Sequence, residues 1–249
     1  NMGALLNRPL LNLMDQSTSL ALFGSGQIAA DNLVAILANG IAFYYFERVL
    51  QNDWKLAHSP ENLTDTRRLY RYVWMLYTLI LATAGVIFTL RYALYLSSGP
   101  NTATTVWLAN GLTLVLVYVP LWAWAWQTIE KTRKETGQYA TTLRFAALYL
   151  LALTGAFVTL GVSSSILADL LRALLGEAVT LTSFLSENGE RLAIVLALGV
   201  VWIYFGRRLS LDIAAQAEVQ RRAALLRFYR SILALAGNVA VFTALWRIL

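Results

Sequence analysis

The chain has no cysteine and only one histidine, His58. Without cysteine there is no disulfide, no thiolate metal site and no cysteine nucleophile. His58 lies in a polar stretch between two apolar segments, so no apolar segment supplies an imidazole as the axial ligand of a haem, a chlorophyll or a metal ion. We therefore expect no cofactor to be ligated by histidine or cysteine from this chain. A bound lipid, or a pigment held by a partner chain, is compatible with this composition.

Charged residues are also scarce, at 14% of the chain, whereas hydrophobic residues reach 58%. Soluble domains average about 25% charged and about 45–50% apolar residues. The excess apolar surface needs lipid as its solvent, so the class is integral membrane. The formal net charge of +6 arises from basic residues between the apolar segments. Basic loops between apolar segments are typical of membrane proteins. The positive charge therefore needs no nucleic-acid partner, and we expect none.

Six apolar stretches approach or reach the length of about 20 residues that a membrane-spanning helix needs. The fifth is short unless it extends back toward Thr182. The sequence therefore predicts an all-α membrane protein with about six transmembrane helices and short interfacial segments on the outer side of the membrane. The stretches are 32–50, 70–96, 106–127, 144–164, 191–206 and 226–247.

The loops after the first, third and fifth stretches are basic, whereas the other two are uncharged or acidic. Cationic loops resist translocation, so loops 51–68, 128–144 and 207–230 are predicted to be cytoplasmic. This orientation places residue 1 outside, although no signal peptide precedes the first stretch. We therefore expect either an upstream span or a cleaved signal.

The tryptophans lie near the predicted ends of the spans. Indole rings favour the headgroup layer, where the ring is half-buried and the N–H stays hydrated. We expect most of them to anchor the helices there, although some can instead pack between helices. The cytoplasmic set is Trp54, Trp74, Trp122, Trp124, Trp126 and Trp202, and the outer set is Trp107 and Trp246.

Short motifs recur along the chain. Leu-Ala-Asn-Gly stands at 37–40 and again at 108–111, and residues 81–90 resemble 151–160 without a gap. One period contains two spans, so the sequence predicts parallel repeats within a single membrane domain, 1–249. The chain then begins and stops inside a repeat, which again favours an upstream span. The divisions are a partial repeat 1–50, repeats 66–128 and 140–208, and a partial repeat 221–249.

Each predicted span of a repeat carries a glycine, which lies near the middle of the first span, and the glycines of successive repeats stand at matched depths. Small residues let helix backbones approach closely where lipid provides no hydrophobic drive, so we expect these glycines to mark helix packing. The alternative is that glycine is simply frequent in membrane helices. The positions are Gly40, Gly85, Gly111, Gly155, Gly199 and Gly237.

The most polar side chains expected inside spans are Asn39, Asn110 and Asn238. Ionisable groups at mid-depth, which mark transport and proton pathways, are almost absent. An asparagine in a span more often makes a helix–helix hydrogen bond than binds a substrate. No phosphate loop, nucleophile elbow or metal-ligand pair occurs, so no catalytic site is predicted.

The segment from Ile166 to Glu177 is apolar, with Asp169 and Arg172 spaced to form an i,i+3 pair. This spacing favours an amphipathic helix lying in the outer interface. The alternative is a simple extension of the fourth span.

Three predicted spans begin with basic and aromatic residues, at 68–72, 143–145 and 226–230. These starts, the glycine-centred spans and the second span of a repeat, which ends in Pro-Leu-Trp-Ala-Trp-Ala-Trp at 120–126, resemble an uncharacterised bacterial family. That family is known only as a domain of unknown function and is built from repeated pairs of membrane helices. The resemblance covers most of the chain. It implies a multi-pass protein of the bacterial inner membrane and carries over no catalytic residue.

Our first functional hypothesis is a non-catalytic accessory or scaffolding subunit of a bacterial membrane complex, one version of which is an energy-converting complex. The subunit would pack against lipids, other membrane subunits or copies of itself. The alternative is a transporter or channel module, with parallel repeats around a central path. A membrane enzyme acting on lipid is the weakest interpretation, because no acid, base and nucleophile cluster is present.

Overall fold

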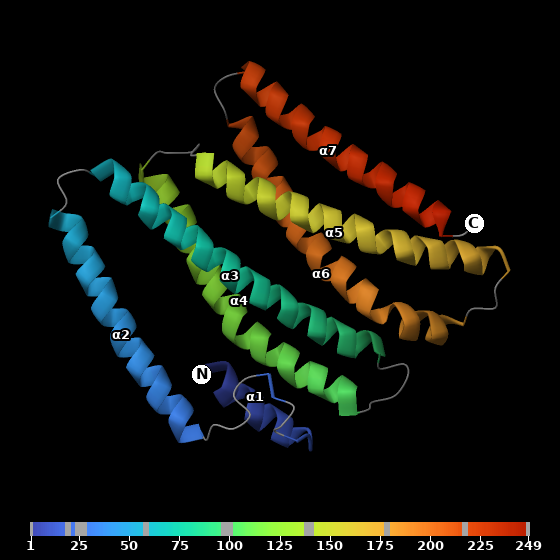
Figure 1. The fold of residues 1–249 in the computed structure, drawn as a ribbon, viewed down its shortest axis with the longest axis horizontal. Helices are drawn as coiled ribbons and strands as arrows, with labels where there is room; N and C mark the ends of the chain where they lie inside the picture. The colour runs from blue at the N-terminus through green and yellow to red at the C-terminus, as the bar shows by residue number, and fades with distance from the viewer. Residues whose placement is uncertain are drawn as a thin grey trace. The chain divides into compact units, whose positions relative to one another are not determined.

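The computed structural model describes residues 2–17, 21–22, 29–56, 60–95, 102–136, 142–176, 180–215 and 219–247. These residues form helices joined by short turns, with no strand among them (Figure 1). The helices are α1 (Met2–Leu13), α2 (Ala29–Leu56), α3 (Pro60–Tyr95), α4 (Thr102–Thr136), α5 (Thr142–Leu174), α6 (Leu181–Ala214) and α7 (Val219–Trp246).

Five helices are long and apolar enough to cross a membrane. They confirm five of the six predicted spans. In α2 the described apolar stretch is only Ala30–Ala42. The qualifying segments are Arg68–Tyr95, Thr104–Lys131, Leu143–Leu174, Leu181–Ala214 and Ala223–Trp246.

The segment from Ile166 onward does not form a separate interfacial helix. Helix α5 runs unbroken from Thr142 to Leu174, so the preferred prediction was wrong and the segment extends the fourth span. No proline or glycine interrupts the helix there. It ends where Gly176 adopts a φ of 108°, a conformation that glycine reaches at little cost. The predicted pairing of Asp169 with Arg172 is confirmed, at 3.8 Å.

The fifth predicted span does extend backward, because α6 begins at Leu181. Its start is fixed by a capping box. Thr180 Oγ1 accepts a hydrogen bond from the Ser183 backbone N–H at 3.2 Å, and Ser183 Oγ accepts one from the Thr180 N–H at 3.1 Å. These bonds satisfy two backbone donors that would otherwise lack a helical partner.

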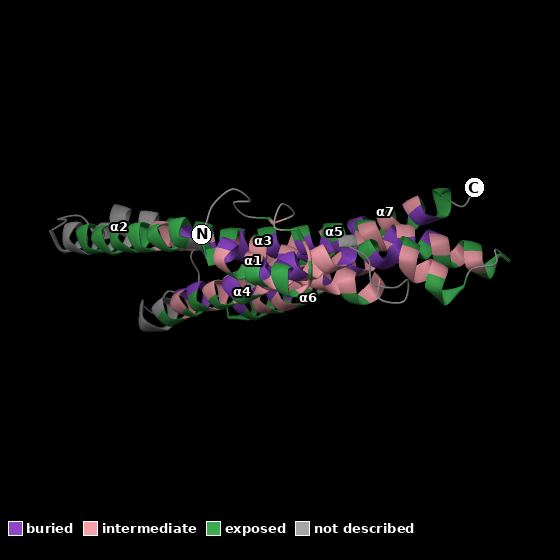
Figure 2. Ribbon diagram, turned by 90° about the horizontal axis from the view of Figure 1, so that it is seen from below, coloured by how far each residue is buried: buried purple, intermediate pink, exposed green. Residues whose placement is uncertain are grey.

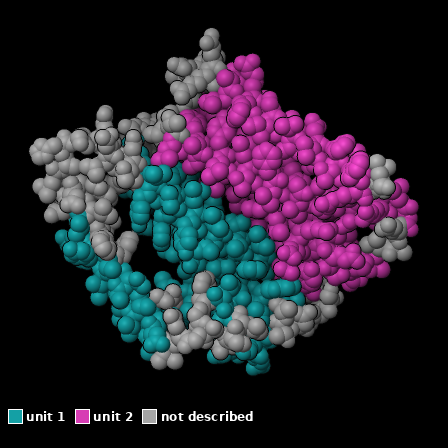
Figure 3. All heavy atoms as spheres, viewed as in Figure 1, with its two compact units in different colours: residues 1–89, 101–129 teal, residues 90–100, 130–249 magenta. Residues whose placement is uncertain are grey.

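The chain divides into two compact units (Figure 3). Unit 1 comprises residues 1–89 and 101–129, and unit 2 comprises residues 90–100 and 130–249. Unit 1 therefore contains α1, α2 and most of α3 and α4. Unit 2 contains α5, α6 and α7 together with the last residues of α3 and α4.

Buried side chains in unit 1 lie mainly on α1, α3 and α4 (Figure 2). Met75 on α3 and Ala109 on α4 are fully buried, and so is Leu11 on α1. Helix α1 also contacts α2. Most of the described side chains of α2 are nevertheless exposed, including Leu37 and Ile41. Helix α2 thus presents apolar side chains that the described residues of unit 1 do not cover.

In unit 2, α5 packs against both α6 and α7 (Figure 1). Leu148 and Ala152 of α5 and Leu209 of α6 are fully buried. Helix α7 buries fewer of its described side chains, namely Tyr229, Ala236 and Ala244, and leaves much of its surface exposed.

Candidate functional site

Helices α3 and α4 approach each other closely in unit 1. A Cβ atom at Gly85 would lie 2.7 Å from Leu114 Cβ and 2.8 Å from the Val115 nitrogen. A Cβ atom at Gly111 would lie 2.8 Å from the Thr89 nitrogen. These separations leave no room for any side chain, so glycine is what lets the two backbones meet. Thr89 Oγ1 donates a hydrogen bond to the Gly85 carbonyl at 2.9 Å within α3.

A similar approach joins α5 to α6 in unit 2. A Cβ atom at Gly155 would lie 3.0 Å from Trp202 Cβ and 3.1 Å from the Trp202 nitrogen. Gly199 is less tightly enclosed, with Thr159 Cγ2 at 3.9 Å as its near neighbour. Gly155 is therefore required for this contact, whereas Gly199 makes an ordinary van der Waals contact.

The remaining two predicted packing glycines lie elsewhere. A Cβ atom added to Gly40 in α2 or to Gly237 in α7 would have no neighbour within 4 Å, so a methyl group at either position would meet open space. The six glycines thus divide into three at tight contacts, one at an ordinary contact and two on uncovered faces.

One predicted asparagine takes part in a buried hydrogen-bond cluster. Asn7 Nδ2 on α1 donates to Asn110 Oδ1 at 2.7 Å and to Thr113 Oγ1 at 3.1 Å, both on α4. Asn7 is fully buried. This cluster docks the short helix α1 on α4. In contrast, Asn39 on α2 and Asn238 on α7 are exposed.

The sequence did not single out Asn7. It stands among leucines before the first predicted span, in a segment expected only to be interfacial. The one available signal was a polar side chain inside an apolar helical run, which needs a partner when it is buried.

A buried ion-pair cluster, the Arg144 cluster, joins three helix ends in unit 2. Arg144 Nε at the start of α5 lies 2.5 Å from Asp212 Oδ2 near the end of α6. Arg144 Nη2 lies 2.8 Å from Glu130 Oε1 in α4. The Arg144 side chain is 3% exposed and that of Asp212 is 7% exposed. The sequence placed Arg144 at the boundary between the basic loop 128–144 and the span 144–164, and nothing there indicated that it is buried.

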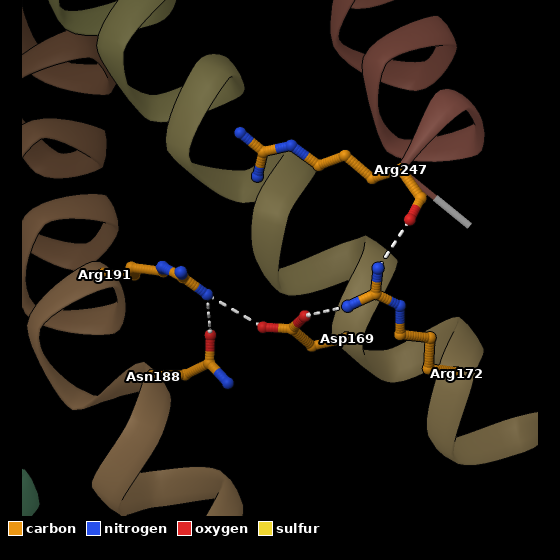
Figure 4. A network of polar contacts seen from close by, with 5 residues as sticks. All are labelled: Asp169, Arg172, Asn188, Arg191 and Arg247. Atoms are coloured by element: carbon orange, nitrogen blue, oxygen red, sulfur yellow. Dashed lines mark hydrogen bonds and ion pairs between the residues drawn. The ribbon is translucent and has the colours of Figure 1, made fainter. Parts of the chain in front are cut away.

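A second polar cluster, the Asp169 cluster, lies near the end of α5 and the start of α6, away from the Arg144 cluster. Figure 4 shows its members, Asp169, Arg172, Asn188, Arg191 and Arg247. Asp169 accepts a hydrogen bond from Arg191 Nη1 at 2.8 Å, and the same nitrogen donates to Asn188 Oδ1 at 2.9 Å. Arg172 Nη2 donates to the Arg247 carbonyl at 2.5 Å, just after the end of α7. Side chains from α5 and α6 and the backbone after α7 are thereby connected.

The predicted tryptophan anchors occupy different surroundings. Trp124 and Trp246 are well exposed, and Trp74 is just exposed, whereas Trp126 is buried. Trp202 is half-buried against Gly155, and its Nε1 donates to the Tyr229 hydroxyl at 3.1 Å. Trp107 and Trp122 are half-buried, and the side chain of Trp54 and residue His58 lie outside the part of the molecule that is described.

The side chains in these clusters join helices to one another through hydrogen bonds and ion pairs. Within the described part of the chain, Glu130, Asp169 and Asp212 in these clusters are each paired with an arginine. Outside them, Glu190 lies 3.0 Å from Arg91 Nη2. Among the described residues, no group of three or more histidine, cysteine, aspartate or glutamate side chains is placed to hold a metal ion.

The long apolar helices and their internal polar contacts define a multi-pass helical membrane protein. Residues 68–204 match the model of a family described as Domain of unknown function (DUF5671). The match covers more than half of the chain, so the protein belongs to this family, in agreement with the expected resemblance to an uncharacterised family. No curated protein and no solved structure matches the chain.

Proposed function

We propose that the protein is a non-catalytic membrane subunit that scaffolds an assembly within the bilayer. The observation that carries this proposal is the contrast between its polar and apolar side chains. The clustered charges bind one another inside the chain, at Arg144 with Asp212 and at Arg191 with Asp169. Large apolar side chains on α2 and α7, in contrast, remain exposed. Such surface is available for other membrane proteins or for lipids.

The proposed architecture is a set of parallel two-helix repeats, with α3–α4 and α5–α6 as the complete ones. Two matching contacts support it. Within the first helices, Gly85 and Thr89 align without a gap with Gly155 and Thr159. Within the second helices of the repeats, α4 and α6, here called the return helices, Gly111 and Leu114 align without a gap with Gly199 and Trp202. In both pairs of helices the first glycine faces the aligned Leu114 or Trp202, and the second glycine faces the aligned threonine.

In this architecture α2 is the return helix of one repeat and the sixth span, and α7 is the first helix of another. The Leu-Ala-Asn-Gly motif at 37–40 and Gly237 support these assignments. The basic loops 51–68, 128–144 and 207–230 would face the cytoplasm, and the membrane would be the bacterial inner membrane.

One version of the scaffold is an accessory subunit of an energy-converting complex, in which partner chains hold any pigment. The absence of cysteine and the single histidine in the sequence fit such a division of labour. The transporter alternative has less support, because Asn110 is bonded to Asn7 while Asn39 and Asn238 lie on exposed helix faces.

The proposal is tested by purifying the tagged protein from its own membrane in a mild detergent and measuring the mass of the protein component by light scattering. A scaffold elutes in an assembly larger than the 27.7 kDa chain. Recovery of the chain alone as a folded monomer would overturn the proposal.

A further inference from the structure

The two polar clusters of unit 2 stand at the two ends of its membrane-crossing part. Arg144 and Asp169 are 25 positions apart on α5, and no charged residue lies between them. At 1.5 Å per residue this stretch is about 38 Å long, whereas the hydrocarbon core of a bilayer is about 30 Å thick and the whole bilayer about 40–45 Å. With Arg144 in one headgroup layer, Asp169 therefore lies in the other, at the depth of the lipid phosphates.

The Asp169 cluster contains more guanidinium groups than carboxylates. Arg172 and Arg191 share the single carboxylate of Asp169, and Figure 4 shows them reaching it from opposite sides. Each of these two arginine side chains is 44% exposed. Arg247, whose carbonyl accepts the hydrogen bond from Arg172, is exposed as well. The cluster therefore carries positive charge that Asp169 does not neutralise.

Other carboxylates at this end of unit 2 do not remove the excess. Glu190 is paired with Arg91 at 3.0 Å, and Glu187 is exposed one turn before Arg191. When these residues are included, the arginines still outnumber the carboxylates among the described residues, so an anion is favoured here. The arginines are Arg91, Arg172, Arg191 and Arg247, and the carboxylates are Asp169, Glu187 and Glu190.

The two central arginines also have hydrogen-bond donors to spare, since a guanidinium group carries five N–H donors. Arg191 donates to Asp169 and to Asn188 through Nη1 alone, and no described residue accepts a hydrogen bond from its Nε or Nη2. Arg172 donates through Nη2 to the Arg247 carbonyl, and no described residue accepts one from its Nε. A phosphate group supplies the negative charge and the acceptor oxygens that such donors bind best.

An exposed strip of α5 runs from Arg172 into the hydrocarbon. Ser165, Gly161 and Val158 precede Arg172 by about two, three and four helical turns, so all lie on one side of the helix. Gly161 and Val158 are exposed, and a Cβ atom at Gly161 would have no neighbour within 4 Å. We call these three residues the α5 strip. It reaches about 21 Å below Arg172, which is about the depth of one leaflet.

We propose that Arg172 and Arg191 bind the phosphate of a phospholipid, and that one acyl chain of this lipid lies along the α5 strip. The charge, the depth of the arginines and the strip below them all match this occupant. Free phosphate would leave the strip unused, and an uncharged lipid would leave the donors unfilled. The site needs no second polypeptide, so it goes beyond the proposed scaffold function and does not depend on it.

The first test titrates the protein in a mild detergent with three probes, and native mass spectrometry counts what stays bound. Phosphatidylglycerol carries a phosphate and acyl chains, diacylglycerol carries only the chains, and inorganic phosphate is the anion alone. We expect phosphatidylglycerol to bind at concentrations at which neither of the other probes does. Diacylglycerol bound equally well would show that apolar surface alone holds the lipid. Inorganic phosphate bound equally well would show a site for the free anion. Either result would overturn the proposal.

The second test removes the two guanidinium groups in the double variant Arg172→Gln, Arg191→Gln. Its dissociation constant for phosphatidylglycerol should rise by about tenfold or more, because charge-assisted hydrogen bonds are lost. The matched control, Arg207→Gln with Arg227→Gln, removes the same charge from exposed positions near the other ends of α6 and α7. The control should bind the lipid as the unaltered protein does. Equal losses in the two double variants would reduce the effect to general charge attraction and overturn the site.

The third test changes the α5 strip without changing a charge. Gly161→Leu places a bulky side chain in the middle of the strip and should weaken phosphatidylglycerol binding severalfold. Gly237→Leu on α7 is the control, because an added Cβ at either glycine has no neighbour within 4 Å. Circular dichroism shows that each variant keeps its helices. An unchanged affinity of Gly161→Leu would overturn the placement of the acyl chain.

The same measurements separate this site from the scaffold function. A lone monomer that loses phosphatidylglycerol only in the Arg172→Gln, Arg191→Gln variant would support the site and overturn the scaffold. A larger assembly in which this variant binds the lipid as tightly as the unaltered protein would overturn the site and leave the scaffold function standing.

Discussion

Arg144 and Asp212 form an ion pair of 2.5 Å, although 68 positions separate them in the sequence and both side chains are nearly fully buried. Glu130 contributes a second carboxylate at 2.8 Å. The pair ties the start of α5 to the end of α6, at the side expected to face the cytoplasm. A charge buried in this way is tolerated only while its counter-charge remains.

We predict that Asp212→Ala destabilises the protein by about 3–5 kcal/mol, because it deprives the buried Arg144 of one of its two carboxylates. Thermal loss of helical circular dichroism in a fixed detergent measures the effect. The matched control is Asp169→Ala in the Asp169 cluster, where the arginines are 44% exposed. There the cost should be near the ~0–1 kcal/mol typical of exposed pairs. Equal losses in the two variants would contradict the prediction.

A second prediction concerns the glycine contact in unit 1. Gly85→Ala should destabilise by about 1–3 kcal/mol, since its Cβ would lie 2.7 Å from Leu114 Cβ and 2.8 Å from a backbone nitrogen that cannot move aside easily. Gly161→Ala is the control, because it meets open space and alanine favours a helix over glycine by about 1 kcal/mol. Melting temperatures should therefore shift in opposite directions. A neutral Gly85→Ala would show that α3 and α4 are not held in this contact.

The spans were the most predictable part of the fold, because a run of about 20 apolar residues identifies a spanning helix without any tertiary information. The end of α5 was not predictable in this way. Its polar spacing at Asp169 and Arg172 favours an interfacial helix, but a longer span can carry the same spacing. The decisive residue was Gly176, whose positive φ ends the helix only after Leu174.

The polar clusters were harder to predict, since they depend on how each helix is rotated about its axis. Charge counting treats Arg144 and Arg133 alike as basic loop residues, yet Arg144 is buried among carboxylates from two other helices. Asn110 was recognised as a polar residue in a span, but its partner Asn7 lies 103 positions away. A single sequence contains no signal that joins such distant positions.

A third prediction follows from the Asn7–Asn110 hydrogen bond of 2.7 Å. Replacing either residue by alanine should loosen α1 from α4. A double-mutant cycle should give a coupling of about 0.6 kcal/mol and at most about 1.7 kcal/mol, the average and the maximum for hydrogen bonds between helices inside a membrane. Hydrogen exchange of the α1 amides provides the measurement, and Asn238→Ala on an exposed face is the control. Additive effects of the two substitutions would exclude a direct interaction.

The fourth prediction separates a scaffold from a transporter. The triple variant Asn39→Leu, Asn110→Leu, Asn238→Leu removes the polar groups that a central path would use. Under the proposed function it loses stability through Asn110 but leaves ion and solute flux in reconstituted vesicles unchanged. The comparison is with Asn110→Leu alone, which carries the same loss of the Asn7 hydrogen bond. A flux present in the single variant and absent in the triple variant would favour the transporter.

The last prediction concerns sidedness, and α6 offers a probe at each end. Thr182 near its start and Ala215 just after its end are both exposed. Because the cationic loop 207–230 resists translocation, Ala215→Cys should react with a membrane-impermeant maleimide only after the membrane is opened. Thr182→Cys should react in intact cells. The chain has no cysteine of its own, so each signal reports one position. Labelling in the reverse order would invert the whole topology, whereas labelling of both positions from outside would show that α6 does not span the membrane.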